Sequence, residues 1–403
     1  MTQISRDTFD QVMVPNYSPA AIIPVRGEGS RLWDDEGNEY LDMAAGIAVN
    51  AVGHCHPDVV AALEKQAHQL WHLSNAYTNK PILALAEKLI ASTFAEKVYF
   101  ANSGGEVNEA AFKLARKHAQ DNFGPEKNQI IAFDNGFHGR TLFTVSVGGQ
   151  PKYTQGFEPL PQGITHLPFN DLEKLEAEIS DKTCAVVLEP IQGEGGILLA
   201  DQAFLEKARE LCDRFDALLI FDEIQTGMGR TGDLFAYMGY EVVPDILTSA
   251  KAIGAGFPMA AMLTTDKIAA SLGIGSHGST YGGNALAGAV GNAVFDIINT
   301  EEVLQGVKDK SKIIIDLLNT INHKYQVFDD IRGKGLMIGC GLSDSWRGKA
   351  KSFIGAGIQH NVMVLMAGPD TVRLVPSLLI SNEEIHEALA RFERAVAQLV
   401  NES

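Results

Sequence analysis

Short apolar runs alternate with amphipathic helical patterns through the middle of the chain, and this alternation constrains the fold more than any other feature. The runs are rich in β-branched or aromatic residues and end at Gly, Pro or acidic residues, as buried parallel strands do. Between them, apolar residues recur at helical spacing. The pattern predicts an α/β domain with a mainly parallel sheet. The predicted strands span residues 97–101, 130–133, 184–189 and 218–221, and the predicted helices residues 107–118 and 204–215.

The two ends of the chain follow a different pattern. Before about His54, short strand-like pieces are separated by glycine, which is typical of a small sheet. After about residue 300, helices alternate with strands at 336–340 and 362–365, and a helix closes the chain. We therefore expect both ends to form one smaller α+β domain beside a larger one. The expected division is residues 1–54 and 301–403 for the smaller domain and residues 55–300 for the larger.

The composition favours a globular protein that acts on small molecules. The chain has 403 residues, of which 45% are hydrophobic, and this is enough for a substantial core. Its 50 acidic residues outnumber 33 basic ones, for a formal net charge of −17. Nucleic acids and anionic membrane surfaces both require basic protein surfaces, so neither is an expected partner.

The cysteines and the first residues indicate a cytoplasmic protein. The four cysteines are scattered without Cys-x-x-Cys spacing, so we expect neither a disulfide framework nor a zinc site. His54, Cys55 and His56 resemble metal ligands only superficially, and no metal is expected. The first residues contain Asp7 and Asp10 and lack the apolar core of a signal peptide. No run approaches the roughly 18 apolar residues of a membrane span.

Lys251 lies in an apolar, Gly-rich segment, and the run LLIFDE upstream carries Asp222. A buried lysine has a lowered pKa and suits the formation of a Schiff base with an aldehyde. A buried acid could hold a ring nitrogen protonated, as pyridoxal phosphate requires. Two other interpretations stay open at this point. Most lysines are simply solvated, and a strand followed by Asp-Glu also describes the magnesium-binding strand of an ATPase.

Ser103, Gly104 and Gly105 lie between a predicted strand and a strong helix. Free backbone N–H groups at such a helix start bind phosphate, although a plain strand-to-helix turn explains the residues equally well. Two Gly-x-Gly-x-x-Gly matches, at residues 227–232 and 273–278, lack the strand–helix setting of a dinucleotide site. No phosphate-binding loop of an ATPase is present in the sequence.

Several segments, in this order, resemble the class-III (subgroup III, fold-type I) pyridoxal-phosphate aminotransferases, which act on terminal amines. They are SGGEVNEAAFKLAR, FHGRT, EPIQGEGG, FDEIQTGMGRTG, TSAKAIGAGFP and GSTYGGN, and they span most of the chain. The resemblance implies a large domain with a seven-stranded, mainly parallel sheet and a smaller α+β domain. It also implies pyridoxal 5'-phosphate as cofactor and a homodimer with shared active sites.

The resemblance assigns cofactor roles to individual residues. Lys251 would form the Schiff base and carry the proton during transfer, and Asp222 would pair with the pyridinium nitrogen. Phe137 and Ile224 would enclose the ring, and Gln225 would lie near its phenolic oxygen. The remaining expected cofactor contacts are Ser103, Gly104, Gly105 and Glu223, with Thr280 of the partner subunit at the phosphate.

The resemblance also implies two carboxylate sites. Arg140, with Ser279 of the partner subunit close by, would bind the α-carboxylate of an acylated ornithine. Arg373 would bind the α-carboxylate of 2-oxoglutarate or glutamate, and Glu194 would neutralise it when the amine-bearing substrate is bound. A planar guanidinium suits both carboxylates. Each of these charges, taken alone, is also compatible with an ordinary salt bridge.

The implied reaction moves the δ-amino group of an acylated ornithine to 2-oxoglutarate. The sequence leaves the acyl donor open between acetylornithine, succinylornithine and succinyl-diaminopimelate, and with it a biosynthetic or a catabolic role. Two other classes stay as alternatives. One is a nicotinamide-dependent oxidoreductase, which rests on the glycine patterns, and the other is a non-catalytic binding protein on the same scaffold.

Overall fold

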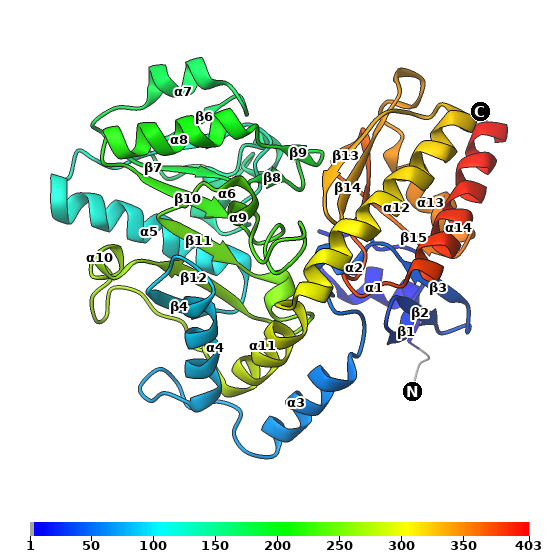
Figure 1. The fold of residues 1–403 in the computed structure, drawn as a ribbon, viewed down its shortest axis with the longest axis horizontal. Coiled ribbons are helices and arrows are strands. Elements are labelled where there is room, and N and C mark those ends of the chain that lie inside the picture. The colour runs from blue at the N-terminus through cyan, green and yellow to red at the C-terminus, as the bar shows by residue number, and fades with distance from the viewer. Residues whose placement is uncertain (1–3, 403) are drawn as a thin grey trace.

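The large sheet has seven strands, and residues 4–402 are described in the computed structural model (Figure 1). Five neighbouring strands, from β11 (Ile246–Ser249) at one end to β6 (Ile164–Leu167) at the other, are parallel. Only β12 (Ala260–Thr264) runs antiparallel to both of its neighbours. The predicted α/β fold with a mainly parallel sheet is confirmed. In spatial order the strands are β4 (Lys97–Ala101), β12 (Ala260–Thr264), β11 (Ile246–Ser249), β10 (Leu218–Asp222), β7 (Thr183–Leu188), β5 (Gln129–Phe133) and β6 (Ile164–Leu167).

Helices cover both faces of this sheet, which explains why its strands read as continuous apolar runs. Along β10, Leu219 and Phe221 pack in the hydrophobic cluster that contains α8 (Gln202–Arg214). Ile220, which points to the opposite face, packs in the cluster that contains α5 (Gly104–Phe123). The other helices of this region are α3 (Pro57–Ala67), α4 (Lys80–Ala91), α6 (Leu142–Val147), α7 (Leu172–Glu178), α9 (Ala236–Tyr240), α10 (Asp266–Ala269) and α11 (Ala285–Ile298).

Two four-stranded sheets lie beside the large sheet, and both ends of the chain contribute to them. Val362 in β15 (Val362–Met363) pairs in parallel with Leu41 in β3 (Glu39–Asp42), so a C-terminal strand completes the N-terminal sheet. The first sheet contains β1 (Pro24–Glu28), β2 (Arg31–Asp34), β3 (Glu39–Asp42) and β15 (Val362–Met363). The second contains β13 (Phe328–Lys334), β14 (Met337–Leu342), β17 (Thr371–Leu374) and β16 (Leu365–Met366).

The prediction of a single strand at residues 362–365 is wrong. The structure has two short strands there, β15 and β16, and they belong to different sheets. The chain crosses from one sheet to the other at Val364, whose side chain is buried. Since both strands are apolar, the local sequence carries no sign of the crossing.

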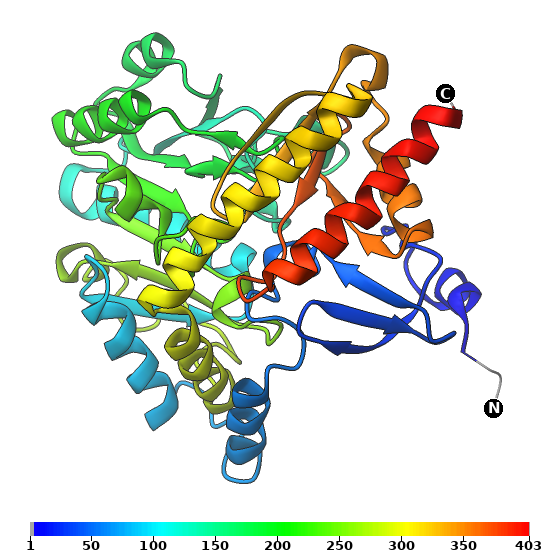
Figure 2. The same ribbon diagram turned by 45° about the vertical axis from the view of Figure 1, so that its right-hand side comes forward.

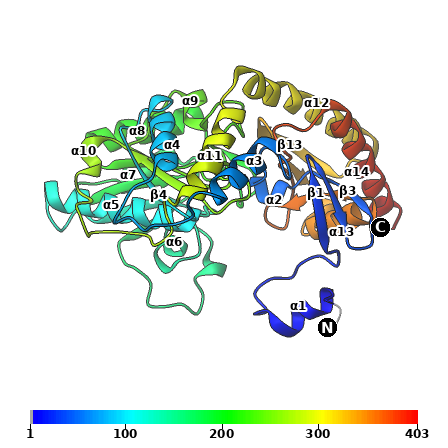
Figure 3. The same cartoon turned by 90° about the horizontal axis from the view of Figure 1, so that it is seen from below.

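The longest helices cover the outside of the C-terminal region. Helix α12 (Glu301–Tyr325) runs beside α14 (Asn382–Glu402), and α13 (Ala350–Gln359) packs against α14 (Figure 2). Helix α1 (Arg6–Val12) lies apart from the rest of the molecule, and none of its residues is buried (Figure 3). No helix within residues 4–402 is both long and apolar enough to cross a membrane.

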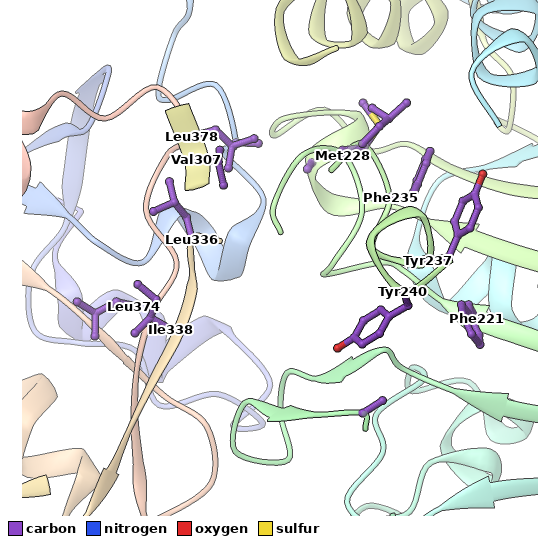
Figure 4. Close-up of a cluster of buried hydrophobic side chains, with 14 of the residues drawn as sticks. Phe221, Met228, Phe235, Tyr237, Tyr240, Val307, Leu336, Ile338, Leu374 and Leu378 are labelled. Carbon is purple, nitrogen blue, oxygen red and sulfur yellow. The ribbon is translucent and has the colours of Figure 1, made fainter. Parts of the chain in front are cut away.

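One hydrophobic cluster extends from the large sheet into the C-terminal region. It joins Phe221 and Met228 with Val307, Leu336 and Leu374 (Figure 4). The two regions therefore share a core, and the expected division at residues 54 and 300 stays a prediction. The short elements that complete the fold are α2 (Ala45–Ala48), η1 (Pro151–Tyr153), β8 (Ile191–Gln192), β9 (Leu198–Leu199), η2 (Lys251–Ile253) and η3 (Asp344–Trp346).

Candidate active site

A cavity of about 310 Å³ lies where strands of the large sheet reach their carboxyl ends. Strand β10 ends at Asp222, and Glu189 and Lys251 follow shortly after β7 and β11. Parallel α/β sheets bind ligands at this edge. Among the residues that line the cavity are Asn102, Ser103, Gly104, Gly105, Phe137, His138, Glu189, Asp222, Ile224, Gln225 and Lys251.

Both carboxylate oxygens of Asp222 accept hydrogen bonds. Its Oδ2 lies 2.7 Å from the Nδ2 of Asn108 and 2.8 Å from the Nδ1 of His138, and its Oδ1 accepts the Ile224 backbone N–H. The Thr248 hydroxyl in turn donates to the Oδ1 of Asn108. Burial alone lowers the pKa of His138, but the hydrogen bond and charge of Asp222 outweigh it, so the pKa is raised. Asp222 is thus held rigidly beside a proton-bearing imidazole.

Lys251 is the first residue of η2, directly after β11, and its φ is +49°. The side chain is half-buried, because it lines the cavity. Within the described residues, its Nζ forms no hydrogen bond or ion pair. Burial lowers the pKa of Lys251, although the charge of Glu194 opposes the effect. The amine is therefore available for chemistry in the cavity.

The start of α5 is closely packed at Gly104. A Cβ on Gly104 would lie 2.7 Å from the Cδ1 of Ile224, whereas a Cβ on Gly105 would meet no atom closer than 3.9 Å. The Ser103 hydroxyl caps the helix by accepting the Glu106 backbone N–H. The first N–H groups of a helix have no partner inside it, so this turn presents donors to the cavity.

Arg373 on β17 is 2% exposed and lies beside the cavity, where it contacts Gln225 of the lining. Its Nη1 donates to the Oε1 of Glu194 at 2.6 Å and to the Oε1 of Gln225 at 3.3 Å. Burial alone would raise the pKa of Glu194, but the charge and hydrogen bond of Arg373 outweigh it, so the pKa is lowered. The structure thus brings Arg373 and Glu194 together as an ion pair next to Gln225.

Arg140 lies outside the cavity, three residues after Phe137 of its lining, and is exposed. Its guanidinium carbon is 3.7 Å from the centre of the Tyr153 ring and 5.5 Å from that of Phe137. In the part of the chain that the structure describes, Arg140 forms no ion pair and no hydrogen bond. Its donors are free.

Besides Arg140, the predicted residues Glu223, Ser279 and Thr280 do not line the cavity of this chain. Glu223 points away from it, because successive side chains at the end of a strand face opposite sides, and it accepts the backbone N–H groups of Ala236 and Tyr237. Burial raises the pKa of Glu223 to about 7. The Ser279 hydroxyl accepts a hydrogen bond from Asn102, and Thr280 is exposed.

Residues 12–396 match the family model described as aminotransferase class-III. The chain belongs to this family. The resemblance to the class-III aminotransferases is thereby confirmed, and the chain is a pyridoxal-phosphate-dependent aminotransferase.

Relatives within the family are similar over almost their whole length. An acetylornithine aminotransferase of Shewanella oneidensis is 62% identical, with 98% of each chain covered. A succinylornithine transaminase/acetylornithine aminotransferase of Pseudomonas aeruginosa is also 62% identical over 99% of this chain and 98% of its own. A solved N-acetylornithine aminotransferase of Stenotrophomonas maltophilia is 41% identical with a TM-score of 0.87, and covers 98% of this chain and 100% of its own.

The cavity of this class-III aminotransferase fits pyridoxal phosphate. Lys251 presents an unpaired amine, Asp222 a rigid carboxylate, and the start of α5 at Gly104 a set of N–H donors. Phe137 and Ile224 are half-buried apolar residues of the lining. Together these groups would hold the aldehyde, ring nitrogen, phosphate and ring faces of the cofactor.

Sequence reasoning missed three residues of the site, which are Asn108, His138 and Glu189. Glu189 is 6% exposed and accepts the backbone N–H groups of Phe137 at 2.8 Å and Gly193 at 3.2 Å. Burial raises the pKa of Glu189 to about 7. Like Asp222, Glu189 lies at the carboxyl end of a buried strand, and this shared pattern could have identified it. Asn108 and His138 carry no such signal.

Proposed function

We propose that this aminotransferase moves the δ-amino group of N2-acetylornithine to 2-oxoglutarate, giving N-acetylglutamate semialdehyde and glutamate. The pairing of a buried, neutralised Arg373 with an exposed, unpaired Arg140 is the observation that carries this proposal. The two substrates present their carboxylates differently, and the two arginines differ in burial and in whether an acid neutralises them. The names of the relatives support a reaction of arginine biosynthesis.

The residues of the cavity have distinct tasks in this reaction. Pyridoxal phosphate, when bound, supplies the aldehyde that accepts an amino group and the ring that withdraws electrons from the substrate carbon. Asp222 would hold the proton at the ring nitrogen of the bound cofactor, and His138 and Asn108 fix the position of its carboxylate. The lowered pKa of Lys251 lets its Nζ take a proton from the amine-bearing carbon and return it later.

The two half-reactions use different arginines. Arg140 would hold the α-carboxylate of the acylated ornithine while its δ-amine enters the cavity. Glu194 meanwhile keeps Arg373 neutralised, so the amine-bearing chain meets no unpaired cation. When 2-oxoglutarate enters, its α-carboxylate would replace Glu194 on Arg373. One cavity therefore accepts both an amine and a dicarboxylate.

A homodimer is part of this proposal. Thr280 of the partner subunit would contact the phosphate, and Ser279 of the partner subunit would lie near Arg140. Trp71, Tyr77 and Tyr281 are each more than half exposed on one chain, as expected of residues that a second copy covers. We also retain the cytoplasm as the compartment and the division at residues 54 and 300 as the domain boundaries.

The proposal is tested with Lys251→Ala. Loss of the proton-transferring amine alone should lower kcat by a factor of about 10² to 10⁴. Borohydride should attach the cofactor covalently to the wild-type protein and not to the variant, as measured by mass spectrometry. Lys312→Ala, at an exposed lysine of α12, is the matched control and should behave as wild type. A Lys251→Ala variant with full turnover would contradict the mechanism.

Succinylornithine is the second candidate donor, since the Pseudomonas aeruginosa relative is named for both acyl groups. Succinyl-diaminopimelate is the third, because a Yersinia pestis relative, 58% identical over 98% of each chain, is named for it. The values of kcat/KM for the three donors, each with 2-oxoglutarate, measure the preference directly. We expect the highest value with N2-acetylornithine.

A further inference from the structure

Arg140 is an exposed cation that has no acidic partner within residues 4–402, in a protein with a net charge of −17. Its guanidinium lies against an aromatic ring instead. The guanidinium carbon lies 3.7 Å from the centre of the Tyr153 ring, which is stacking distance. A guanidinium stacked on a ring contacts the ring with its flat face, so its N–H donors, which lie in its plane, stay free.

Tyr153 belongs to the loop region that also forms part of the cavity wall. It ends η1, and its backbone N–H donates to the carbonyl of Gln150 at 3.0 Å. The side-chain Nε2 of Gln150 donates to the carbonyl of Asn135 at 3.1 Å. The Tyr153 ring also meets the Phe137 ring edge-on, at 6.1 Å and 84°. The ring is therefore fixed relative to Phe137, which lines the cavity.

Lys152 approaches the same ring, with its Nζ 4.7 Å from the ring centre. It too has no acidic partner in the described part of the chain. Lysine carries a compact charge without the planar fork that matches a carboxylate, so the two cations are not equivalent. Lys152 therefore serves as a matched control for the charge alone.

We propose that Tyr153 is a positioning residue for Arg140, holding the guanidinium flat on its ring so that the in-plane donors are ready for the α-carboxylate of the acylated ornithine. This inference rests on the proposed function. A long arginine side chain on the surface otherwise samples many rotamers, and ordering them on binding weakens affinity. The ring selects the binding conformation in advance.

Tyr153→Leu tests this inference in the holoenzyme. Loss of the stacking contact should raise KM for N2-acetylornithine about threefold to tenfold, with little change in kcat. Tyr153→Phe keeps the aromatic face and should retain the wild-type KM. The half-reaction with glutamate, which uses Arg373, should stay within about twofold of wild type in both variants, because neither variant changes the Arg373 site.

A double-mutant cycle separates positioning from general structure. In an Arg140→Met background, Tyr153→Leu should cause no further rise in KM, because no guanidinium remains to be held. Lys152→Met should leave KM within about twofold of wild type, since that charge is exposed and screened by solvent. An undiminished Tyr153 effect in the Arg140→Met background would overturn the inference, and so would an equal effect of Lys152→Met.

Failure of the inference is distinguishable from failure of the proposed function. Wild-type protein without activity on N2-acetylornithine would overturn both. Wild-type activity combined with an unchanged KM in Tyr153→Leu would overturn only the role of Tyr153. An equal loss for N2-acetylornithine and glutamate in Tyr153→Leu would show damage to the fold, and would also overturn it.

Discussion

Arg140 and Arg373 are both proposed carboxylate receptors, but their surroundings are opposite. Arg373 is 2% exposed, emerges from a buried strand and is paired with Glu194 at 2.6 Å. Arg140 is exposed, lies on a loop and rests on the ring of Tyr153. One arginine is neutralised by an acid, whereas the other is only supported by an aromatic ring.

The difference follows from the cost of burying charge. An unpaired cation in a buried site is strongly unfavourable, so Arg373 needs a counterion whenever its substrate is absent. Solvent screens Arg140, which therefore needs no acid. A buried arginine must therefore exchange one anion for another when its substrate binds, whereas an exposed arginine can remain without a counterion. Only the buried site can therefore act as a switch.

Arg373→Ala should have the largest effect. It removes one partner of a buried, hydrogen-bonded charge pair, which typically costs 2–5 kcal/mol, so KM for 2-oxoglutarate should rise by about a hundredfold or more. Stopped-flow measurement of each half-reaction checks this, and the acyl-donor half-reaction should be much less affected. Arg347→Ala, at an exposed arginine, is the control. Retained affinity for 2-oxoglutarate would mean that its carboxylate binds elsewhere.

Arg140→Met should affect the opposite half-reaction. Hydrogen bonds to a charged group contribute about 1.5–3 kcal/mol, so KM for N2-acetylornithine should rise about tenfold to a hundredfold. Because Arg140 is exposed, the melting temperature should not change. Arg140→Lys keeps the charge but loses the fork, and should recover only part of the affinity. If Arg140→Met instead weakens the binding of 2-oxoglutarate, the assignment of the two arginines to different substrates is contradicted.

Glu194→Gln should have a smaller effect of opposite sign. With no carboxylate competing for Arg373, 2-oxoglutarate should bind more tightly, by about threefold to tenfold if the pair contributes about 1 kcal/mol. Steady-state KM for 2-oxoglutarate measures this change. KM for N2-acetylornithine should show no matching decrease, since Glu194 does not contact Arg140. Weaker binding of 2-oxoglutarate in this variant would rule out the proposed exchange of anions.

The sequence predicted the large sheet well because its signal is local. Its central strands, such as β10, are apolar runs that helices cover on both faces, as at Leu219 and Ile220. The turn at Gly104 was also predictable, since glycine marks a position where a side chain would clash with Ile224. The assigned roles of the site residues, in contrast, are still predictions.

What the sequence could not predict depends on tertiary contacts. The split between β15 and β16 arises from pairing with β3 and β17, which are distant in the chain. The contact of Tyr153 with Arg140 lies in a loop region without periodicity, so no pattern indicates it. Glu223 follows Asp222 directly, yet the two side chains face opposite sides at the end of β10, a difference that motif matching ignores.

The pH dependence of stability gives the smallest predicted difference between the two arginines. The pKa of Glu194 lies below its ordinary value of 4.5, so its ionised form is favoured in the folded state. The ion pair should therefore stabilise the fold above pH 4.5, and this contribution should be lost as the pH falls through the lowered pKa. Unfolding in urea should show that Glu194→Gln is less stable than wild type at pH 7, because the variant leaves the buried Arg373 without its counterion, and that this difference shrinks at pH 4. Arg140 has no acidic partner that could be protonated, so the free energy of unfolding of Arg140→Met should differ from that of wild type by the same amount at both pH values. A parallel pH trend in both variants would contradict the contrast between the buried and the exposed arginine.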